Sequence, residues 1–202
     1  MAELYDGAAS GWQAGIDRLG FDAAYENLTN CALTYQPIKS AERILDAGAG
    51  TGAAARMFAT QSGRSDCQFD LLDPSKEMLA QAVQNIRGTT RAVFGALGEP
   101  ALAQQQYDRV LCAHVIEHCP DPQAQINWLF RRLHPNGTAV FAISKPHWCT
   151  ALVRWRWGNS SFHPTLVRGM LETAGFTNIE ICRHPSGPPS RVSCGYLARR
   201  PT

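Results

Sequence analysis

Hydrophobic positions from residue 43 onward form short apolar runs that alternate with longer stretches of helical periodicity. The apolar runs predict strands over residues 43–46, 67–72, 91–94, 107–113, 138–143, 177–182 and 192–198. The periodic stretches predict helices over residues 51–61, 75–86, 123–133 and 164–173. Because strands and helices alternate, we expect an α/β protein built on a largely parallel sheet.

Two stretches break this alternation. Before residue 40, Trp12, Ile16 and Tyr25 follow a loosely helical spacing, which predicts one or two helices that cap the sheet. Residues 145–161 have weak periodicity and contain Trp148, Trp155 and Trp157, so we expect an insertion that forms a lid over the sheet. A stretch rich in proline and glycine, residues 185–189, predicts a linker. We expect a single domain over residues 1–202, with a cap (1–40), a core (41–144), the lid (145–161) and a C-terminal part (162–202).

Composition and charge narrow the class of protein. The formal net charge is +2, from 19 basic and 17 acidic residues, and no basic run suits a phosphate backbone, so we expect no nucleic-acid partner. No apolar stretch reaches the roughly 18 residues of a membrane span, and the N-terminus lacks the pattern of a secretory signal. We therefore expect a soluble, cytoplasmic protein. The seven cysteines include no C-x-x-C pair, which predicts free thiols, and the oligomeric state stays open.

The strongest local motif is the turn I-L-D-A-G-A-G-T-G at residues 44–52, which follows a predicted strand and opens a predicted helix. Glycines in such a turn let a ligand approach the backbone and leave amide groups to meet an anion, either a phosphate or a carboxylate. The dinucleotide fingerprint is G-x-G-x-x-G, whereas the spacing here is G-x-G-x-G. Asp46 beside the turn suits an ammonium group better than a pyrophosphate. The motif therefore favours the amino acid end of a ligand.

A second acidic position, Asp73, ends the second predicted strand. A carboxylate at that place can accept hydrogen bonds from both hydroxyls of an adenosine ribose. The alternative is that Asp73 only caps the following helix, where aspartate is common.

These motifs resemble the class I S-adenosylmethionine-dependent methyltransferases, in particular the branch of the ubiquinone and menaquinone methyltransferases. The resemblance spans residues 42–182 and rests on five pieces in order, at residues 45–52, 72–79, 107–118, 133–137 and 174–176. It implies a doubly wound, seven-stranded Rossmann-like sheet with an N-terminal helical cap. It also implies S-adenosyl-L-methionine as the cofactor and a small molecule as the methyl acceptor.

The resemblance also assigns the cofactor contacts. Asp46, Gly48 and Gly50 are expected to hold the methionine end, and Asp73 the ribose. Pro74 and Met78 are expected to flank the adenine. The family often has an acid at the position of Ala96, so backbone groups of Ala96 and Leu97, or the Glu99 side chain, would have to replace that contact. The predicted cofactor-binding set is Asp46, Gly48, Ala49, Gly50, Asp73, Pro74, Met78, Ala96, Leu97 and Ala113.

Residues 114–118 read H-V-I-E-H, which matches the H-x-x-E-H motif of zinc peptidases. That motif needs both histidines on one helix. Here His114 ends an apolar run and Pro120 follows His118 closely, so we expect no such helix and no metal. We place these residues at the carboxyl end of the fourth strand, beside the crevice in which open α/β sheets bind ligands.

Methyl transfer needs alignment and exclusion of water, and a base where the acceptor holds its proton tightly. His114, His118 and His147 are the candidate bases, each with a structural hydrogen-bonding role as the alternative. Aromatic side chains can attract the sulfonium or a cationic acceptor, or can simply pack the cap and lid. The candidate acceptor contacts are Tyr5, Trp12, Trp148, Trp155 and Trp157.

The sequence therefore predicts a methyltransferase that acts on a small molecule. Two other classes stay open. One is a module that binds S-adenosylmethionine without catalysing transfer, because this chemistry has no obligatory catalytic residue. The other is a nicotinamide-dependent oxidoreductase, which the glycine spacing disfavours.

Overall fold

A computed structural model describes residues 20–147 and 160–202. Its centre is one seven-stranded sheet in the order β3-β2-β1-β4-β5-β7-β6. The strands are β1 (Arg43–Ala47), β2 (Gln68–Asp73), β3 (Thr89–Phe94), β4 (Tyr107–Ala113), β5 (Leu133–Ser144), β6 (Thr177–Cys182) and β7 (Ser193–Arg199). Only β7 runs antiparallel to its neighbours β5 and β6, while the other pairs are parallel. The predicted doubly wound α/β sheet is confirmed.

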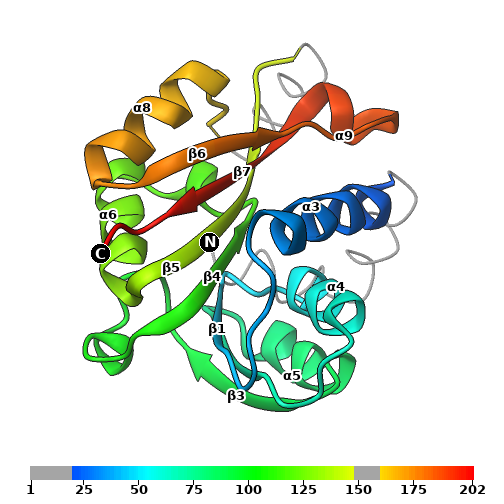
Figure 1. The fold of residues 1–202 in the computed structure, drawn as a ribbon. Coiled ribbons are helices and arrows are strands. Elements are labelled where there is room, and N and C mark those ends of the chain that lie inside the picture. Colours follow the sequence, from blue (N-terminus) through cyan, green and yellow to red (C-terminus); the bar gives the residue numbers. More distant parts are fainter. Residues whose placement is uncertain (1–19, 148–159) are drawn as a thin grey trace.

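Helices cover both faces of the sheet, as Figure 1 shows. One face carries α3 (Phe21–Tyr35), α4 (Ala53–Ser62) and α5 (Lys76–Asn85), and the other carries α6 (Pro122–Arg132) and α8 (Pro164–Ala174). The remaining helices are α9 (Gly187–Val192) and the short turns η1 (Pro100–Leu102) and η2 (Ile116–His118). Each layer of helices encloses its own apolar core.

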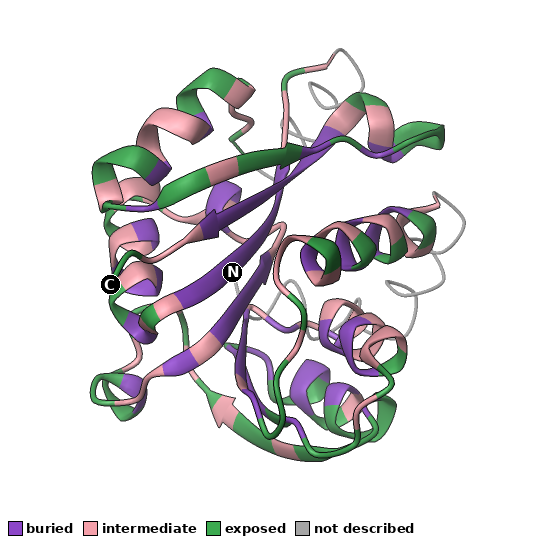
Figure 2. Ribbon diagram, viewed as in Figure 1, coloured by how far each residue is buried: buried purple, intermediate pink, exposed green. Residues whose placement is uncertain are grey.

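Burial follows from this layering. The central strands β1, β4, β5 and β7 are buried along most of their length, and the edge strands β3 and β6 are largely exposed (Figure 2). Strands covered on both faces read as continuous apolar runs, which is why their positions could be predicted from the sequence. The ends of β4 and β6 agree with the prediction residue for residue.

Several other boundaries shift by one or two residues, and two predictions are wrong by more than that. The fifth strand begins at Leu133 instead of residue 138, because Leu133 already pairs with Tyr107 before a register shift. Asn136 accommodates this irregularity with a φ of 64°. The predicted linker at 185–189 contains the start of α9, whose prolines lie in its first turn, where the missing amide costs no helical hydrogen bond.

The prediction of free thiols is wrong for two cysteines. Cys31 of α3 and Cys182 at the end of β6 form a disulfide, with Cα atoms 6.6 Å apart. These residues are 151 positions apart, so no local spacing could reveal that packing brings them together. Cys67, Cys112, Cys119 and Cys194 are free thiols.

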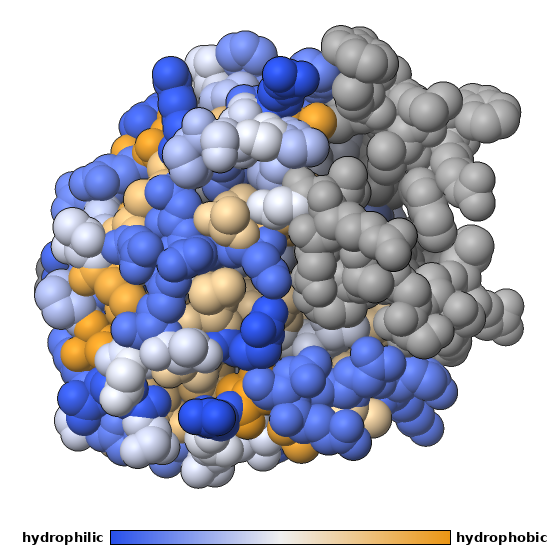
Figure 3. All heavy atoms as spheres, turned by 90° about the vertical axis from the view of Figure 1, so that its right-hand side faces the viewer, coloured by the Kyte–Doolittle hydropathy of each residue, from blue (hydrophilic) through white to orange (hydrophobic). Residues whose placement is uncertain are grey.

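The described surface shows no extended apolar area. The large hydrophobic side chains exposed among the described residues are Val83, Phe94, Leu166 and Ile181, which come from different elements. Figure 3 shows hydrophilic and hydrophobic side chains interspersed over the described part of one face. Within residues 20–147 and 160–202, no helix has the length and apolar character needed to cross a membrane.

Candidate functional site

The glycine-rich turn after β1 folds against the end of β2. Gly48 and Gly50 have φ values of 77° and 53°, in the left-handed region that favours glycine. The amides of Gly48 and Ala49 donate to the carbonyl of Leu72 at 2.7 and 2.9 Å. The Gly50 amide donates to Asp73 Oδ2 at 2.8 Å. The expectation that the turn presents unpaired amides is wrong for these three residues, because the end of β2 accepts their hydrogen bonds.

The turn is tightly enclosed except at one position. A Cβ atom on Gly48 would lie 2.3 Å from Val115 Cγ2, and one on Gly52 would lie 3.0 Å from the Cα of Ala82. A Cβ atom on Gly50 would meet nothing within 4 Å. Gly50 is therefore the point at which a ligand can approach the backbone of the turn.

Asp73 is fixed at the end of β2 by two backbone amides. Its Oδ2 accepts from Gly50 and its Oδ1 accepts from the Ser75 amide at 2.9 Å. The helix cap of α5 is Ser75, whose hydroxyl accepts from the Met78 amide at 3.2 Å. The alternative that Asp73 is the cap of this helix is therefore wrong. Asp73 instead positions a carboxylate next to the glycine turn.

Asp46 places a second carboxylate beside the turn. It is 1% exposed, and its Oδ2 accepts from the Ala55 amide at 3.2 Å. Burial raises the pKa of Asp46 to about 7, the Ala55 hydrogen bond opposes this rise, and the charge of Asp73 adds to it. A carboxyl group held in this way gains from a cationic ligand, which would favour its charged form.

The loop after β3 reaches the same place. The Gly95 amide donates to the Asp73 carbonyl at 3.1 Å, which brings Ala96 and Leu97 next to the end of β2. Ala96 is exposed and Leu97 is partly buried. The Glu99 side chain folds back towards Gly95, and its Oε1 accepts from the Ala101 amide at 3.2 Å.

The predicted adenine contacts lie beyond Asp73. Pro74 is exposed at the start of α5, and Met78 is 3% exposed in its first turn. The structure thus brings the predicted cofactor-binding residues of β1, β2 and β3 to one end of the sheet.

His114 lies at the end of β4 in a strained backbone conformation, with a φ of 57°. Its Nδ1 lies 3.1 Å from Glu117 Oε1 and 3.3 Å from Ser144 Oγ, and its Nε2 lies 3.4 Å from Ser193 Oγ. Glu117 Oε1 also accepts from the Ser144 amide at 2.8 Å. The imidazole is therefore held from both sides. Val115, the next residue in the chain, packs against Gly48, so the backbone at His114 lies close to the glycine turn.

Glu117 stays ionised in this environment. Burial raises its pKa, but the hydrogen bond and the attraction from His114, together with Ser144, outweigh burial and lower the pKa overall. Its second oxygen, Oε2, is buried and has no hydrogen-bond partner among the described residues. In the sequence, Glu117 appeared in the H-x-x-E-H motif and in the piece at residues 107–118 that resembles the methyltransferases, with no role of its own assigned.

Two aromatic residues of α3 cover the His114 ring. The Phe21 ring meets it edge-on with centroids 5.2 Å apart, and the Tyr25 ring lies 6.3 Å away. Burial raises the pKa of the Tyr25 hydroxyl, with smaller contributions from Asp46, Glu117 and Asp22. Tyr25 therefore contacts His114 and lies near Asp46 and Glu117, a place that its helical spacing in the sequence did not reveal.

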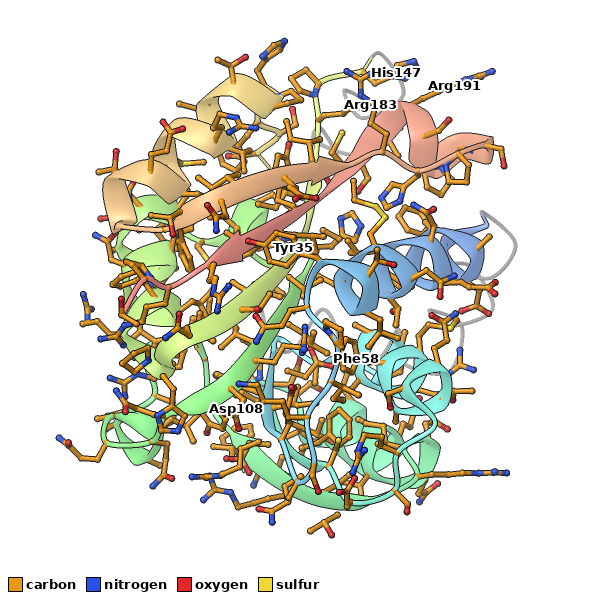
Figure 4. All side chains as sticks on the ribbon, viewed as in Figure 1. Tyr35, Phe58, Asp108, His147, Arg183 and Arg191 are labelled. Carbon is orange, nitrogen blue, oxygen red and sulfur yellow. A yellow bond between two sulfur atoms is a disulfide. The ribbon has the colours of Figure 1, made fainter. Side chains whose placement is uncertain are left out.

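The other candidate bases lie elsewhere at this end of the sheet. His118 ends η2, and its amide donates to the Val115 carbonyl at 2.9 Å. His147 follows β5, and Figure 4 shows it with Arg183 and Arg191 at the α9 end of the molecule. The candidate acceptor contacts Tyr5, Trp12, Trp148, Trp155 and Trp157, and most of the predicted lid, lie outside the described residues.

The H-x-x-E-H residues do not form a zinc-peptidase helix. His114 has left-handed backbone angles and only Ile116–His118 forms a short 3-10 turn, so the two imidazoles share no helix face. Over the described ranges, no group of three or more His, Cys, Asp or Glu side chains is placed to hold a metal ion.

Comparisons with known proteins identify a family whose model matches most of the chain. The family model described as a methyltransferase domain matches residues 17–181. A biotin biosynthesis bifunctional protein of Bordetella avium is 30% identical over 144 residues, which cover 70% of this chain and 30% of that protein. The curated relatives are matched over 30% to 44% of their own length, so the chain spans less than half of each.

Solved structures of low sequence identity share the fold. The methyltransferase solved with the Haloferax volcanii Trm112 activator has a TM-score of 0.74 and 16% identity, with 98% of each chain covered. The N-methyltransferase NodS from Bradyrhizobium japonicum, solved with S-adenosyl-L-homocysteine, has a TM-score of 0.67 and 17% identity, with 89% of this chain and 86% of that chain covered.

Proposed function

Because this chain belongs to the family of methyltransferase domains, we propose that it transfers a methyl group from S-adenosyl-L-methionine to a small molecule. The observation that carries the proposal is the pair of fixed carboxylates, Asp46 and Asp73, on either side of a glycine turn that is open at Gly50. One carboxylate suits the ammonium group of the ligand and the other suits its ribose. A nicotinamide dinucleotide has no ammonium group to neutralise Asp46.

The residues present fit this ligand. Gly48, Ala49 and Gly50 would hold the methionine end, with Asp46 for its ammonium group. Asp73 would accept from the ribose hydroxyls, since a carboxylate oxygen can accept more than one hydrogen bond. Pro74, Met78 and the backbone of Ala96 and Leu97 would hold the adenine, and Ala113 at the end of β4 completes the proposed set.

The bound ligand would supply an activated methyl group on its sulfonium, and the chain has to orient the acceptor and, where the acceptor holds its proton tightly, deprotonate it. His114 is the base of this proposal because it lies beside the glycine turn. Glu117 is its positioning residue, since its carboxylate lies 3.1 Å from His114 Nδ1 and fixes the orientation of the imidazole. His118 and His147 are the other candidates for the base.

The acceptor is proposed to be a small molecule. Tyr25, Glu117 and Ser193 around His114 are buried, and a largely buried polar site suits a molecule that can be enclosed. The aromatic residues Tyr5, Trp12, Trp148, Trp155 and Trp157 are its further proposed contacts. A module that only binds S-adenosyl-L-methionine would show the same ligand affinity without turnover.

Calorimetric titration with S-adenosyl-L-methionine, S-adenosyl-L-homocysteine and NAD tests the function. We expect saturable binding of the two sulfur nucleosides and none of NAD. Binding of NAD alone would overturn the proposal and indicate hydride transfer.

Replacing Asp73 with alanine is expected to weaken binding of S-adenosyl-L-methionine by about 1 to 3 kcal/mol, which is roughly 5- to 150-fold. The loss should depend on the ribose hydroxyls. Adenosine and 2′,3′-dideoxyadenosine, in competition with S-adenosyl-L-homocysteine, should differ in affinity for the natural protein and much less for Asp73→Ala. An equal difference in both proteins would contradict the ribose assignment.

The affinity for S-adenosyl-L-methionine is expected to depend on pH through Asp46. Its raised pKa, about 7, means that below this pH the free protein must release a proton before it can pair with an ammonium group. The affinity should therefore rise by up to about tenfold per pH unit between roughly pH 5 and pH 7 and then level off, while the ligand's amino group stays charged up to about pH 8. Calorimetry across this range measures the slope, and Asp46→Asn should abolish it. A steep slope in Asp46→Asn would assign the titration to another group.

A further inference from the structure

A row of polar side chains crosses the sheet beyond His114. Ser144 on β5 pairs with Ser193 on β7, and Cys182 on β6 pairs with Gly195 on β7. Continuing that register by two residues places His184 at the level of Ser193. Directly opposite residues of antiparallel strands point to the same face, so Ser144, Ser193 and His184 share one face of the sheet.

This face is the one that α3 covers. A Cβ atom on Gly195 would lie 2.5 Å from Leu28 Cδ1 of α3, and the Asn27 side chain donates to the Arg183 carbonyl at 3.2 Å. Arg183 is exposed, and Figure 4 shows it at the outer end of β6 near α9. Because successive residues of an extended chain face opposite sides, His184 points inward, under α3.

The His184 ring is buried and lacks hydrogen bonds. The residue is 5% exposed, and neither ring nitrogen has a hydrogen-bond partner among the described residues. Buried polar groups in proteins nearly always have a hydrogen-bond partner, so an imidazole whose two nitrogens make no hydrogen bond needs an explanation. Burial, followed by repulsion from His114 and Lys145, lowers the pKa of His184 to about 4. The ring is therefore neutral near pH 7 and offers one donor and one acceptor.

The row is continuous with the proposed catalytic site. Val115 packs on the glycine turn, and the neighbouring His114 ring reaches Ser193, the residue level with His184. Open α/β sheets bind ligands at the carboxyl ends of their parallel strands. The row of Ser144, Ser193 and His184 begins at that end of the sheet and extends away from the glycine turn. A molecule positioned beside His114 would therefore have His184 within its reach.

We propose that His184 is a hydrogen-bonding contact for the methyl acceptor and that it binds an uncharged hydroxyl or carbonyl group of that molecule. This rests on the proposed methyltransferase function. An anionic group is disfavoured because the buried carboxylate of Glu117, on the other side of His114, would repel it.

The test compares two probes of nearly equal shape, benzamide and benzoate, on the protein saturated with S-adenosyl-L-homocysteine. Binding is followed by NMR of the labelled histidine rings. We expect benzamide to shift the His184 signals saturably, with a Kd of about 1 to 10 mM, and benzoate to leave them unchanged. His184→Phe should weaken benzamide about tenfold, since it removes the hydrogen bond and keeps the ring volume. His184→Gln keeps a neutral donor and acceptor and should retain binding within about threefold.

The control variant is His134→Phe, at the opposite end of β5, which should change neither probe. Preferential binding of benzoate at His184, or no shift by either probe while the nucleoside binds normally, would overturn the proposal and leave the methyltransferase function standing. Equal benzamide affinity in His184→Phe would also overturn it. Failure of S-adenosyl-L-homocysteine itself to bind would instead contradict the proposed function.

Discussion

A variant with alanine in place of Glu42 is expected to lose about 3 to 5 kcal/mol of unfolding free energy. Glu42 precedes β1 and is 2% exposed, and Arg109 of β4 is fully buried. Arg109 Nε lies 3.2 Å from Glu42 Oε2, and its Nη2 donates to the Gln36 carbonyl at 3.0 Å. Without the carboxylate, a guanidinium would remain buried with no countercharge. Urea unfolding followed by circular dichroism measures the loss.

Two controls separate burial from charge. Arg56→Ala breaks the Arg56–Asp22 pair, whose side chains are 38% and 43% exposed, and should cost less than about 1 kcal/mol. The double variant Glu42→Leu/Arg109→Met should recover most of the stability lost in Glu42→Ala, because it leaves no buried charge. If Glu42→Ala unfolds at the same urea concentration as Arg56→Ala, the buried pair does not stabilise the fold as argued.

The architecture could be predicted because its determinants are local. Buried parallel strands need apolar runs, and the glycine turn after β1 has its own sequence pattern. The order of the strands is not local and was not predicted; the resemblance to a known family implied only a doubly wound, seven-stranded sheet. Where local patterns conflicted with packing the prediction was wrong, as at Leu133, which already pairs with Tyr107 in a strand expected to begin at residue 138.

The site was predictable only for residues inside motifs. Asp46, Gly50 and Asp73 lie in recognisable patterns, and the structure brings them together. Tyr25 reaches the site from a helix far away in the sequence, and His184 reaches it through strand pairing. Such placements depend on tertiary contacts between distant segments, for which a single sequence carries no signal.

Replacing Gly48 with alanine is expected to cost about 2 to 5 kcal/mol of unfolding free energy. Part of this cost is a left-handed backbone with a φ of 77°, which an alanine adopts only at about 1 to 2 kcal/mol. The rest is overpacking, about 1 to 3 kcal/mol, since the new Cβ would lie 2.3 Å from Val115 Cγ2. Gly63→Ala is the matched control, because Gly63 has a φ of 65° and a Cβ there meets nothing within 4 Å. It should lose only the backbone part.

The contact between the turn and the loop after β4 can be isolated with Val115→Ala. In the double variant Gly48→Ala/Val115→Ala, the methyl groups that collide with the new Cβ are gone. The double variant should therefore be more stable than the sum of the two single losses predicts, by at least about 1 kcal/mol. The left-handed strain of residue 48 should remain. If the losses of unfolding free energy simply add, Val115 does not pack against the turn. The placement of His114 beside the bound ligand, which depends on the contact between Val115 and Gly48, would then fail.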